Sequence, residues 1–174
     1  MVIEQNSELT TQSSLFLRAP TVRDGAGVYE LLQRCSGLQL NSGQCYQLLC
    51  EHFHSTCVVA VQDDRVVAFI SSYILPERHD TLFVWQIAVD DALRGRGIAK
   101  KMLRHLLSRR NLKRIRFVEA VLDFSNETAS RLFQSLAREC YCTMDAATTR
   151  DLGKEHMIRV GPISPVSKTL IGRG

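Results

Sequence analysis

The sequence predicts an α/β domain whose central sheet is mixed, mostly antiparallel, and flanked by helices on both faces. Residues 82–89 form an apolar run of β-branched and aromatic residues, which is typical of a strand buried on both faces. Residues 98–107 place apolar side chains at helical spacing. The turn Asp63-Asp64 separates two further apolar runs, which predicts an antiparallel hairpin. Strand and helix patterns alternate along the rest of the chain, which favours helices on both faces.

The elements follow one another in the order β, α, α, β, β, β, α, β, α, β, β. We expect strands at residues 15–18, 56–62, 65–75, 82–89, 115–122, 140–144 and 156–160, and helices at 21–35, 44–52, from 98, and 126–138. A turn is expected at 76–80 and a polar loop at 36–43. The two early helices and the loop between them could form a lid over a site, or an ordinary connection capped by Asn41 and Ser42.

The first helix has a clear start signal. Pro20 ends the preceding strand, Thr21 can cap the helix, and Asp24 lies three residues later as an acidic capping partner. We therefore expect the helix to begin at about Thr21.

Length and composition fit one globular domain: 174 residues, 45% of them hydrophobic and 23% charged. We expect a disordered tail at residues 1–14, a single domain at 15–162 and a C-terminal tail at 163–174. No apolar run approaches the roughly 20 residues of a membrane span, and the N-terminus lacks the features of a secretory signal. The expectation is a cytoplasmic protein with no membrane partner.

Charge and cysteines narrow the function further. The net charge of +4 weakly indicates an anionic partner, but the basic residues are not interleaved with aromatic ones, so we expect no nucleic-acid binding. The six cysteines include no C-x-x-C pair, which is typical of reduced thiols. Cys50, His52, His54 and Cys57 are zinc-type ligands at a spacing that matches no common zinc module. We expect buried cysteines, surface histidines and no metal.

The segment from Arg94 to Ala99, after the buried strand, carries two glycines and leads directly into a helix. Glycines let backbone amides approach a ligand, and the start of a helix adds free N–H groups and the positive end of its dipole. The segment therefore predicts a pyrophosphate cradle with Arg94 and Arg96 beside it. It is neither a Walker A loop nor a dinucleotide fingerprint, because G-K-[ST] and G-x-G-x-x-G are both absent. On these residues alone, an ordinary turn before a helix is equally consistent.

The pattern Arg94-x-x-Gly97-x-Ala99 resembles the acetyl-CoA loop of the GCN5-related N-acetyltransferases, the GNAT superfamily. Other features are similar in the same order: Arg18-Ala19-Pro20-Thr21 with Asp24, the hairpin, the buried strand, and Asn126-x-x-Ala129-x-x-Leu132-Phe133. The resemblance covers residues 16–162. It implies the GNAT fold, acetyl-CoA as co-substrate, and no metal.

Three stretches carry a narrower resemblance: LQLNSGQCYQLLCEHF, LFVWQIAV and SNETASRLFQSLARE look like the L-2,4-diaminobutyrate acetyltransferases of ectoine synthesis, an osmoprotection pathway. This resemblance implies acetyl transfer to the 4-amino group of L-2,4-diaminobutyrate, giving N4-acetyl-L-2,4-diaminobutyrate, by a homodimer. Gln39 and Gln44 stand where that family commonly shows an acid and a tyrosine. The alternatives are an acetyltransferase for another small amine or amino acid, and a non-catalytic acyl-CoA-binding sensor.

The resemblance also implies roles for individual residues. The cofactor-binding residues would be Ile87, Ala88, Val89, Arg94, Gly95, Arg96, Gly97, Ile98, Ala99, Asn126, Ala129 and Phe133. The substrate-binding residues would be Gln39, Asn41, Gln44 and Trp85, although Trp85 could equally fill the core. Many GNAT enzymes carry a tyrosine at the position of Phe133, which protonates the leaving thiolate. Phenylalanine cannot do so. Either another group protonates the thiolate, or it leaves unprotonated, which a thiol pKa of about 8.5 permits near neutral pH.

Direct attack on the thioester requires a neutral amine. An alkyl amine with a pKa of about 10.4 must lose a proton at pH 7, which costs roughly 4–5 kcal/mol, so a base or water chain is needed. Glu119 is the first candidate, because a lone acid in a buried strand is expected to be functional or paired. His156 is the second. The alternatives are an ion pair between Glu119 and a nearby arginine, and an exposed strand end at His156.

Overall fold

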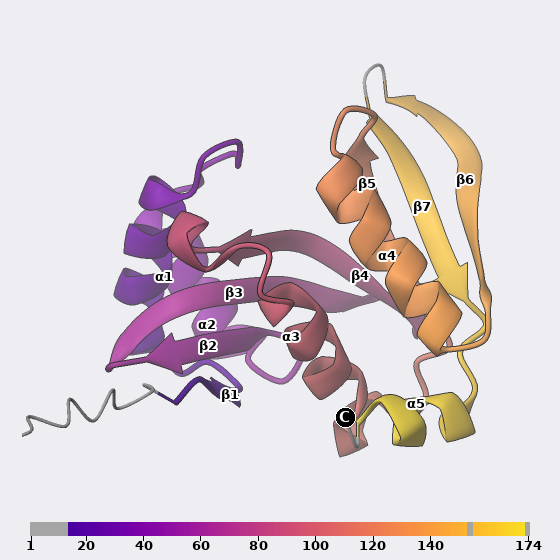
Figure 1. Cartoon of the computed structure of the whole chain (residues 1–174), viewed down its shortest axis with the longest axis horizontal. Helices are drawn as coiled ribbons and strands as arrows, with labels where there is room; N and C mark the ends of the chain where they lie inside the picture. The colour runs from indigo at the N-terminus through magenta and orange to yellow at the C-terminus, as the bar shows by residue number, and fades with distance from the viewer. Residues whose placement is uncertain (1–13, 153–154, 173–174) are drawn as a thin grey trace, which may run out of the picture.

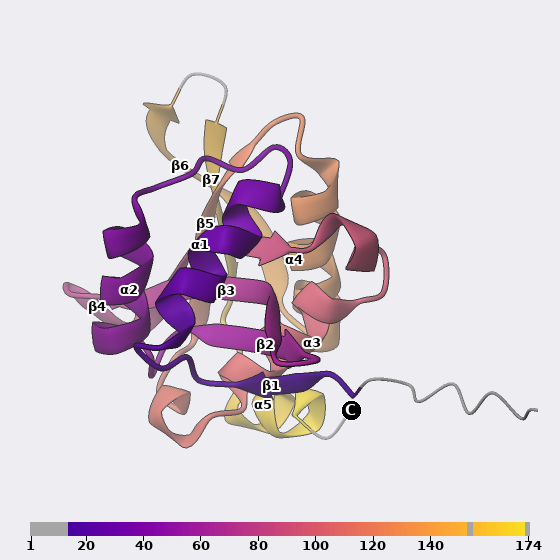
Figure 2. The ribbon, with the colours of Figure 1, turned by 90° about the vertical axis from the view of Figure 1, so that its left-hand side faces the viewer.

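The computed structural model describes residues 14–152 and 155–172. They form a mixed seven-stranded sheet of order β1-β2-β3-β4-β5-β7-β6 with helices on both faces (Figures 1 and 2). All neighbouring strands are antiparallel except β4 and β5, which are parallel. The predicted fold class is confirmed. The tail expected at residues 1–14 lies, apart from Ser14, outside the described residues.

The order of the predicted elements is also confirmed. The strands are β1 Phe16–Arg18, β2 Val58–Gln62, β3 Arg65–Leu75, β4 Arg78–Val89, β5 Phe117–Asp123, β6 Thr143–Leu152 and β7 Glu155–Gly161. The helices are α1 Asp24–Arg34, α2 Gly43–His52, α3 Ile98–Leu107, α4 Glu127–Glu139 and α5 Pro165–Ile171, with short 3₁₀ turns η1 Asp91–Leu93 and η2 Arg110–Leu112.

Several boundaries differ from the expected ones. Strand β4 begins at Arg78 and β6 continues to Leu152, because each is extended by pairing with its neighbour rather than by an apolar pattern of its own. Helix α1 begins at Asp24, three residues later than expected. The expected partnership between Thr21 and Asp24 is present, because the Asp24 carboxylate accepts hydrogen bonds from the Thr21 N–H and hydroxyl at 2.6 and 2.8 Å.

The C-terminal tail expected at residues 163–174 is incorrect for the part that the structure describes. Residues 165–171 form helix α5, which is capped by Ser164 and packs against α3. Ile163 and Ile171 join the main core, and the Lys168 ammonium donates to the backbone carbonyls of Leu112 and Lys113 at 2.7 and 3.2 Å. The helix was missed because it has only seven residues and most of its side chains are exposed.

The core forms two layers, one on each face of the sheet. On one face, buried residues of α1 and α2 pack against β2, β3 and the end of β4. On the other, α3, α4 and α5 cover the strands, and α4 packs against β6 and β7 (Figure 1). The apolar positions predicted for α3 are all buried: Ile98, Met102, Leu103, Leu106 and Leu107.

Strand β4 contains a bulge at Trp85. Ser71 pairs with Gln86 and Ser72 with Val84, so Trp85 is an extra residue in the β3–β4 ladder. Val84 before the bulge and Ile87 after it both contact the α3 side of the core. Side chains alternate along a strand, so Trp85 points away from the face of Val84, and Gln86 points away from the face of Ile87. Trp85 and Gln86 therefore both point to the α2 side, which is possible only because of the bulge.

The bulge coincides with the place where β4 and β5 separate. Their parallel pairing runs only from Thr81 opposite Phe117 to Val84 opposite Ala120. Beyond this point β4 keeps its pairing with β3, β5 keeps its pairing with β7, and the two strands diverge (Figure 1). Residues 85–89 of β4 therefore have a partner strand on one side only, and we call the other side the free edge.

Candidate active site

The free edge of β4 presents main-chain groups that the sheet does not use. The Asp90 N–H donates to the Val67 carbonyl at 2.9 Å, which fixes the phase of the ladder with β3. Because main-chain groups in an antiparallel ladder alternate between the two sides, those of Ala88 face β3, and those of Ile87 and Val89 face the free edge. This edge is able to accept an extended, amide-bearing ligand as an added strand.

After η1, residues 95–99 form a second set of main-chain N–H groups without a protein acceptor, and we call this segment the cradle. Gly95 and Gly97 have φ angles of +78° and +73°, and no atom lies within 4 Å of the position that a Cβ would occupy at either glycine. No protein acceptor is found for the N–H groups of residues 95–99 in the part of the chain that the structure describes. Gly97 provides the N-cap of α3 without a side chain to cap it. The cradle thus fits an anionic diphosphate at the positive end of a helix.

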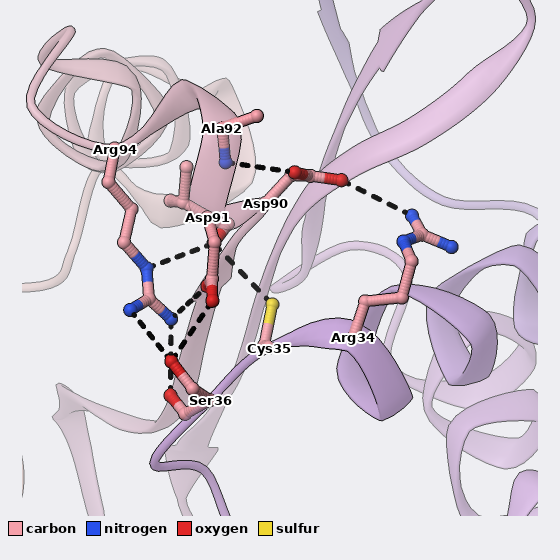
Figure 3. A network of polar contacts seen from close by, with 8 residues as sticks. Arg34, Cys35, Ser36, Asp90, Asp91, Ala92 and Arg94 are labelled. Atoms are coloured by element: carbon pink, nitrogen blue, oxygen red, sulfur yellow. Dashed lines mark hydrogen bonds and ion pairs between the residues drawn. The ribbon is translucent and has the colours of Figure 1, made fainter.

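Arg94 does not belong to this set of free donors, contrary to expectation. Its N–H donates to the Asp91 carbonyl at 3.4 Å, and its guanidinium contacts Val89, Ser36 and Asp91 (Figure 3). The guanidinium of Arg96, by contrast, is exposed and makes no hydrogen bond or ion pair with a described residue. Of the two arginines expected beside a pyrophosphate, only Arg96 has its side chain available.

The second predicted cofactor element is the start of α4. The Asn126 side-chain oxygen caps the helix by accepting from the Ala129 N–H at 3.0 Å, which leaves the amide NH₂ of Asn126 as a donor toward solvent. Ala129 is half-buried, but Phe133 is only 1% exposed and lies inside the main core. A direct contact between the Phe133 ring and a ligand stays a prediction.

On the α2 side, the bulge meets a loop at residues 36–42, which we call the substrate loop. The Gln86 amide donates to the Gln39 carbonyl at 2.8 Å and accepts from the Tyr46 hydroxyl at 3.3 Å. The Tyr46 hydroxyl in turn accepts from the Asn41 N–H at 3.1 Å. Neither Tyr46 nor Gln86 is among the site residues predicted from the sequence, although a glutamine inside an apolar strand indicates that its amide needs a partner.

The other substrate candidates are on the surface. Trp85 is 44% exposed, which rules out the alternative that it fills the core. Gln44 lies in the first turn of α2, and its side chain is exposed without a hydrogen bond to any described residue. The structure therefore joins Gln39 and Asn41 to the bulge and leaves Gln44 and Trp85 free for contact with a ligand.

The two candidate bases lie in different surroundings. Glu119 is 1% exposed, and both carboxylate oxygens accept from Arg78, at 2.5 and 2.7 Å, with Arg159 at 3.5 Å. The ion pair between Glu119 and an arginine, which was the alternative to a catalytic role, is thus present. His156 is half-buried and stacks on Phe124 at 4.5 Å between ring centroids, and its Nδ1 finds no hydrogen-bond partner among the described residues. His156 is therefore not an exposed strand end.

Cys50 and Cys57 are buried whereas His52 and His54 are exposed, as expected. Burial raises the pKa of the Cys50 thiol to about 12 and that of Cys57 to about 11, so both are neutral near pH 7. No group of three metal-ligating side chains is found across residues 14–152 and 155–172. Within the same ranges, every helix is too short or too polar to cross a bilayer.

Comparison with known proteins connects this geometry to a family. Residues 26–137 match the Acetyltransferase (GNAT) family. The L-2,4-diaminobutyric acid acetyltransferase of Halalkalibacterium halodurans is 40% identical over 164 residues, which cover 90% of this chain and 86% of that protein. The enzyme of the same name from Vibrio cholerae is 43% identical over 122 residues, 70% of each chain.

Solved structures agree. Diaminobutyrate acetyltransferase from Paenibacillus lautus, in complex with L-2,4-diaminobutyric acid and coenzyme A, superposes with a TM-score of 0.80 at 35% identity, covering 87% of this chain and 96% of that one. The ribosomal-protein-S18-alanine N-acetyltransferase of Escherichia coli shares the fold, with a TM-score of 0.64 at 20% identity over 87% of this chain and 95% of that one. The chain therefore belongs to the GNAT acetyltransferase family and, within it, to the L-2,4-diaminobutyric acid acetyltransferases.

Proposed function

We propose that this protein transfers the acetyl group of acetyl-CoA to the 4-amino group of L-2,4-diaminobutyrate, forming N4-acetyl-L-2,4-diaminobutyrate. The observation that carries the proposal is the separation of β4 from β5 after Val84, which leaves a free strand edge next to a cradle of unused amides. An acyl-CoA needs both features, because its pantetheine arm carries amides and its diphosphate is anionic.

In this proposal, different residues bind different parts of acetyl-CoA. Residues 95–99 donate to the diphosphate, and Arg96 adds charge. On the free edge, the main-chain groups of Ile87 and the N–H of Val89 pair with the arm, because the Val89 carbonyl already accepts from Arg94. The Ile87 N–H stabilises the negative charge that develops on the thioester oxygen during attack. The Asn126 amide holds the arm near the thioester.

The substrate side begins at the bulge. Trp85 provides an apolar wall for the methylene chain of the amine, and the substrate loop closes the other side through Gln39 and Asn41. Gln44 lies in the first turn of α2, where its side chain is able to contact the amino-acid end of the substrate. Because Gln39 and Gln44 replace an acid and a tyrosine of the family pattern, a different small amine or amino acid is the second candidate substrate.

Deprotonation of the ammonium has two candidate bases. Both carboxylate oxygens of Glu119 already accept hydrogen bonds from Arg78, so neither is free to take a proton from the substrate without breaking one of them. His156 has a ring nitrogen, Nδ1, with no hydrogen-bond partner among the described residues, so it is the better candidate. Phe133 cannot protonate the leaving thiolate, which leaves as the anion or takes a proton from water.

The oligomeric state and location belong to the same proposal. We expect a cytoplasmic homodimer whose partner is a small-molecule amine rather than a nucleic acid or a membrane. Sedimentation of the purified protein tests the dimer.

A substrate panel tests the function. The protein is mixed with acetyl-CoA and each of L-2,4-diaminobutyrate, ornithine, lysine and putrescine, and the release of CoA thiol is measured. We expect kcat/KM to be highest for L-2,4-diaminobutyrate and NMR of the product to place the acetyl group on the 4-amino nitrogen. A higher kcat/KM for another amine would favour the second candidate, and CoA binding without turnover of any amine would favour a sensor.

A further inference from the structure

The substrate loop is fastened to the cofactor-binding strand at its start as well as at its middle. Gln86 holds Gln39 in the middle of the loop. At the start, Ser36 is held by Arg94 and Asp91, which lie just before the cradle. The loop that faces the amine and the segment that faces the diphosphate are therefore connected by side chains, although they are more than 50 residues apart in the chain.

Arg94 makes the connection with all three of its guanidinium nitrogens. Nε donates to the Val89 carbonyl at 3.3 Å, Nη1 to the Ser36 hydroxyl at 3.4 Å, and Nη2 to the Ser36 carbonyl at 3.2 Å (Figure 3). Nη2 also lies 2.7 Å from the Asp91 carboxylate, which accepts from the Ser36 hydroxyl at 3.0 Å. The positive charge of Arg94 is thus balanced within the protein and directed away from the cradle.

We propose that Arg94 is a positioning residue which holds the substrate loop against the end of β4, and that it is not a ligand of the diphosphate. The proposal rests on the proposed function for its effect on the amine. Arg94 immediately precedes Gly95, so an acyl-CoA that immobilises residues 95–99 also immobilises the residue that holds Ser36.

The contacts of Arg94 predict that lysine cannot replace it as a positioning residue. They need a planar fork with donors in three directions, which lysine cannot reproduce even though it keeps the charge. A phosphate ligand, in contrast, would be partly replaced by lysine, because a point charge also attracts phosphate. Arg94→Lys therefore separates the two roles, and Arg96→Gln, two residues away with a free guanidinium, is the matched control.

The experiment measures three quantities on the wild type, Arg94→Lys, Arg94→Gln and Arg96→Gln. They are the hydrogen exchange of residues 36–42 without ligand, the Kd of CoA by calorimetry, and the KM for L-2,4-diaminobutyrate. We expect both Arg94 variants to raise loop exchange and KM roughly five- to tenfold, a partial loss because the contacts are half-exposed. Their CoA Kd should change less than about twofold. Arg96→Gln should weaken CoA binding and leave loop exchange unchanged.

Two results would overturn the proposal. One is a CoA Kd that rises as much in Arg94→Gln as in Arg96→Gln and recovers in Arg94→Lys, which would make Arg94 a phosphate ligand. The other is unchanged loop exchange in both Arg94 variants. The exchange measurement needs no substrate, so it judges the role of Arg94 even if the wild type does not acetylate L-2,4-diaminobutyrate, which would count against the proposed function alone.

Discussion

Helix α3 begins differently from α2, α4 and α5. Each of the other three starts with a side chain that accepts from a first-turn N–H: Ser42 from Cys45 at 3.2 Å, Asn126 from Ala129 at 3.0 Å, and Ser164 from Ser167 at 3.0 Å. Helix α3 starts at Gly97, which is left-handed and has no side chain. Its first N–H groups have no acceptor among the described residues.

The uncapped start of α3 lacks a stabilising contact that the other three helices have. A side-chain cap contributes about 1 kcal/mol, which α3 forgoes. The helix is held instead by its five buried residues, Ile98, Met102, Leu103, Leu106 and Leu107. The uncapped start then leaves its donors and its dipole unused, as the free edge of β4 leaves the main-chain groups of Ile87 unused.

The largest effect is expected when the uncapped start is blocked. Gly97→Val places a branched side chain in the space that the ligand needs, and should weaken CoA binding roughly a thousandfold through the loss of several charge-assisted hydrogen bonds. Gly37→Val is the matched control, because Gly37 also has a φ of +78° and no atom within 4 Å of the Cβ position, and carries the same backbone strain. Calorimetry with CoA should give near-normal affinity for Gly37→Val. Equal losses in the two variants would assign the effect to strain.

Glu119 differs from the free amides of the cradle, because its carboxylate already has a hydrogen-bond partner, Arg78. If Glu119 serves as the base, Glu119→Gln should lower kcat about a hundredfold and change CoA affinity little. If the carboxylate only pairs with Arg78, kcat should persist and unfolding midpoints should fall. Arg78→Gln sharpens the distinction, because it leaves the buried carboxylate without its main partner and should cost about 3–5 kcal/mol of stability. Unchanged turnover in Glu119→Gln would leave His156 as the base, to be tested by the pH profile of His156→Gln.

A capped start should respond in the opposite way to the uncapped one. Ser42→Ala removes the cap of α2 and should lower the free energy of unfolding by about 1 kcal/mol, measured by urea denaturation. The CoA affinity should not change. A large loss of CoA affinity in this variant would mean that the cap of α2 also supports the cradle, which the structure does not show.

The start of α1 provides the smallest and most pH-dependent effect. Burial opposes the charge of Asp24, but hydrogen bonds from Arg18 and Thr21 outweigh it and hold the pKa of this carboxyl below its usual value. A lowered pKa means that the charged form stabilises the fold above a pH of about 4, and that this contribution is lost as the pH falls through that range. Asp24→Asn should therefore lower the unfolding midpoint at pH 7 by more than at pH 3.5. A difference that is constant with pH would contradict the role of the charge.

Local patterns were sufficient to predict much of this molecule. The five apolar positions of α3 follow helical periodicity, and the Asp63-Asp64 turn has the positive φ angles, 49° and 58°, that a tight hairpin requires. The turn at Gly95 and Gly97 before α3 could also be located, because the start of a helix depends on a few consecutive residues. Each of these features is determined within one short segment.

Features that depend on distant partners were not predictable in the same way. The bulge at Trp85 exists only in relation to β3, so the sequence of β4 alone could not show that Trp85 and Gln86 share a face. The contact between Arg94 and Ser36 joins residues 58 positions apart, so the sequence could not show it. Glu119 looked like an isolated acid because its partner Arg78 lies 41 residues away. Helix α5 needs Leu112 and the α3 surface to order it.

The amide resonances of the glycines give the most direct test of whether the free amides before α3 bind the diphosphate of CoA. In ¹H–¹⁵N spectra of the labelled protein, titration with CoA should shift the Gly95 and Gly97 amides strongly, because their N–H groups become donors to the diphosphate. Gly37, with a similar backbone but outside the cradle, should shift much less. Saturable CoA binding that leaves Gly95 and Gly97 unmoved would contradict the claim that these free amides hold the diphosphate.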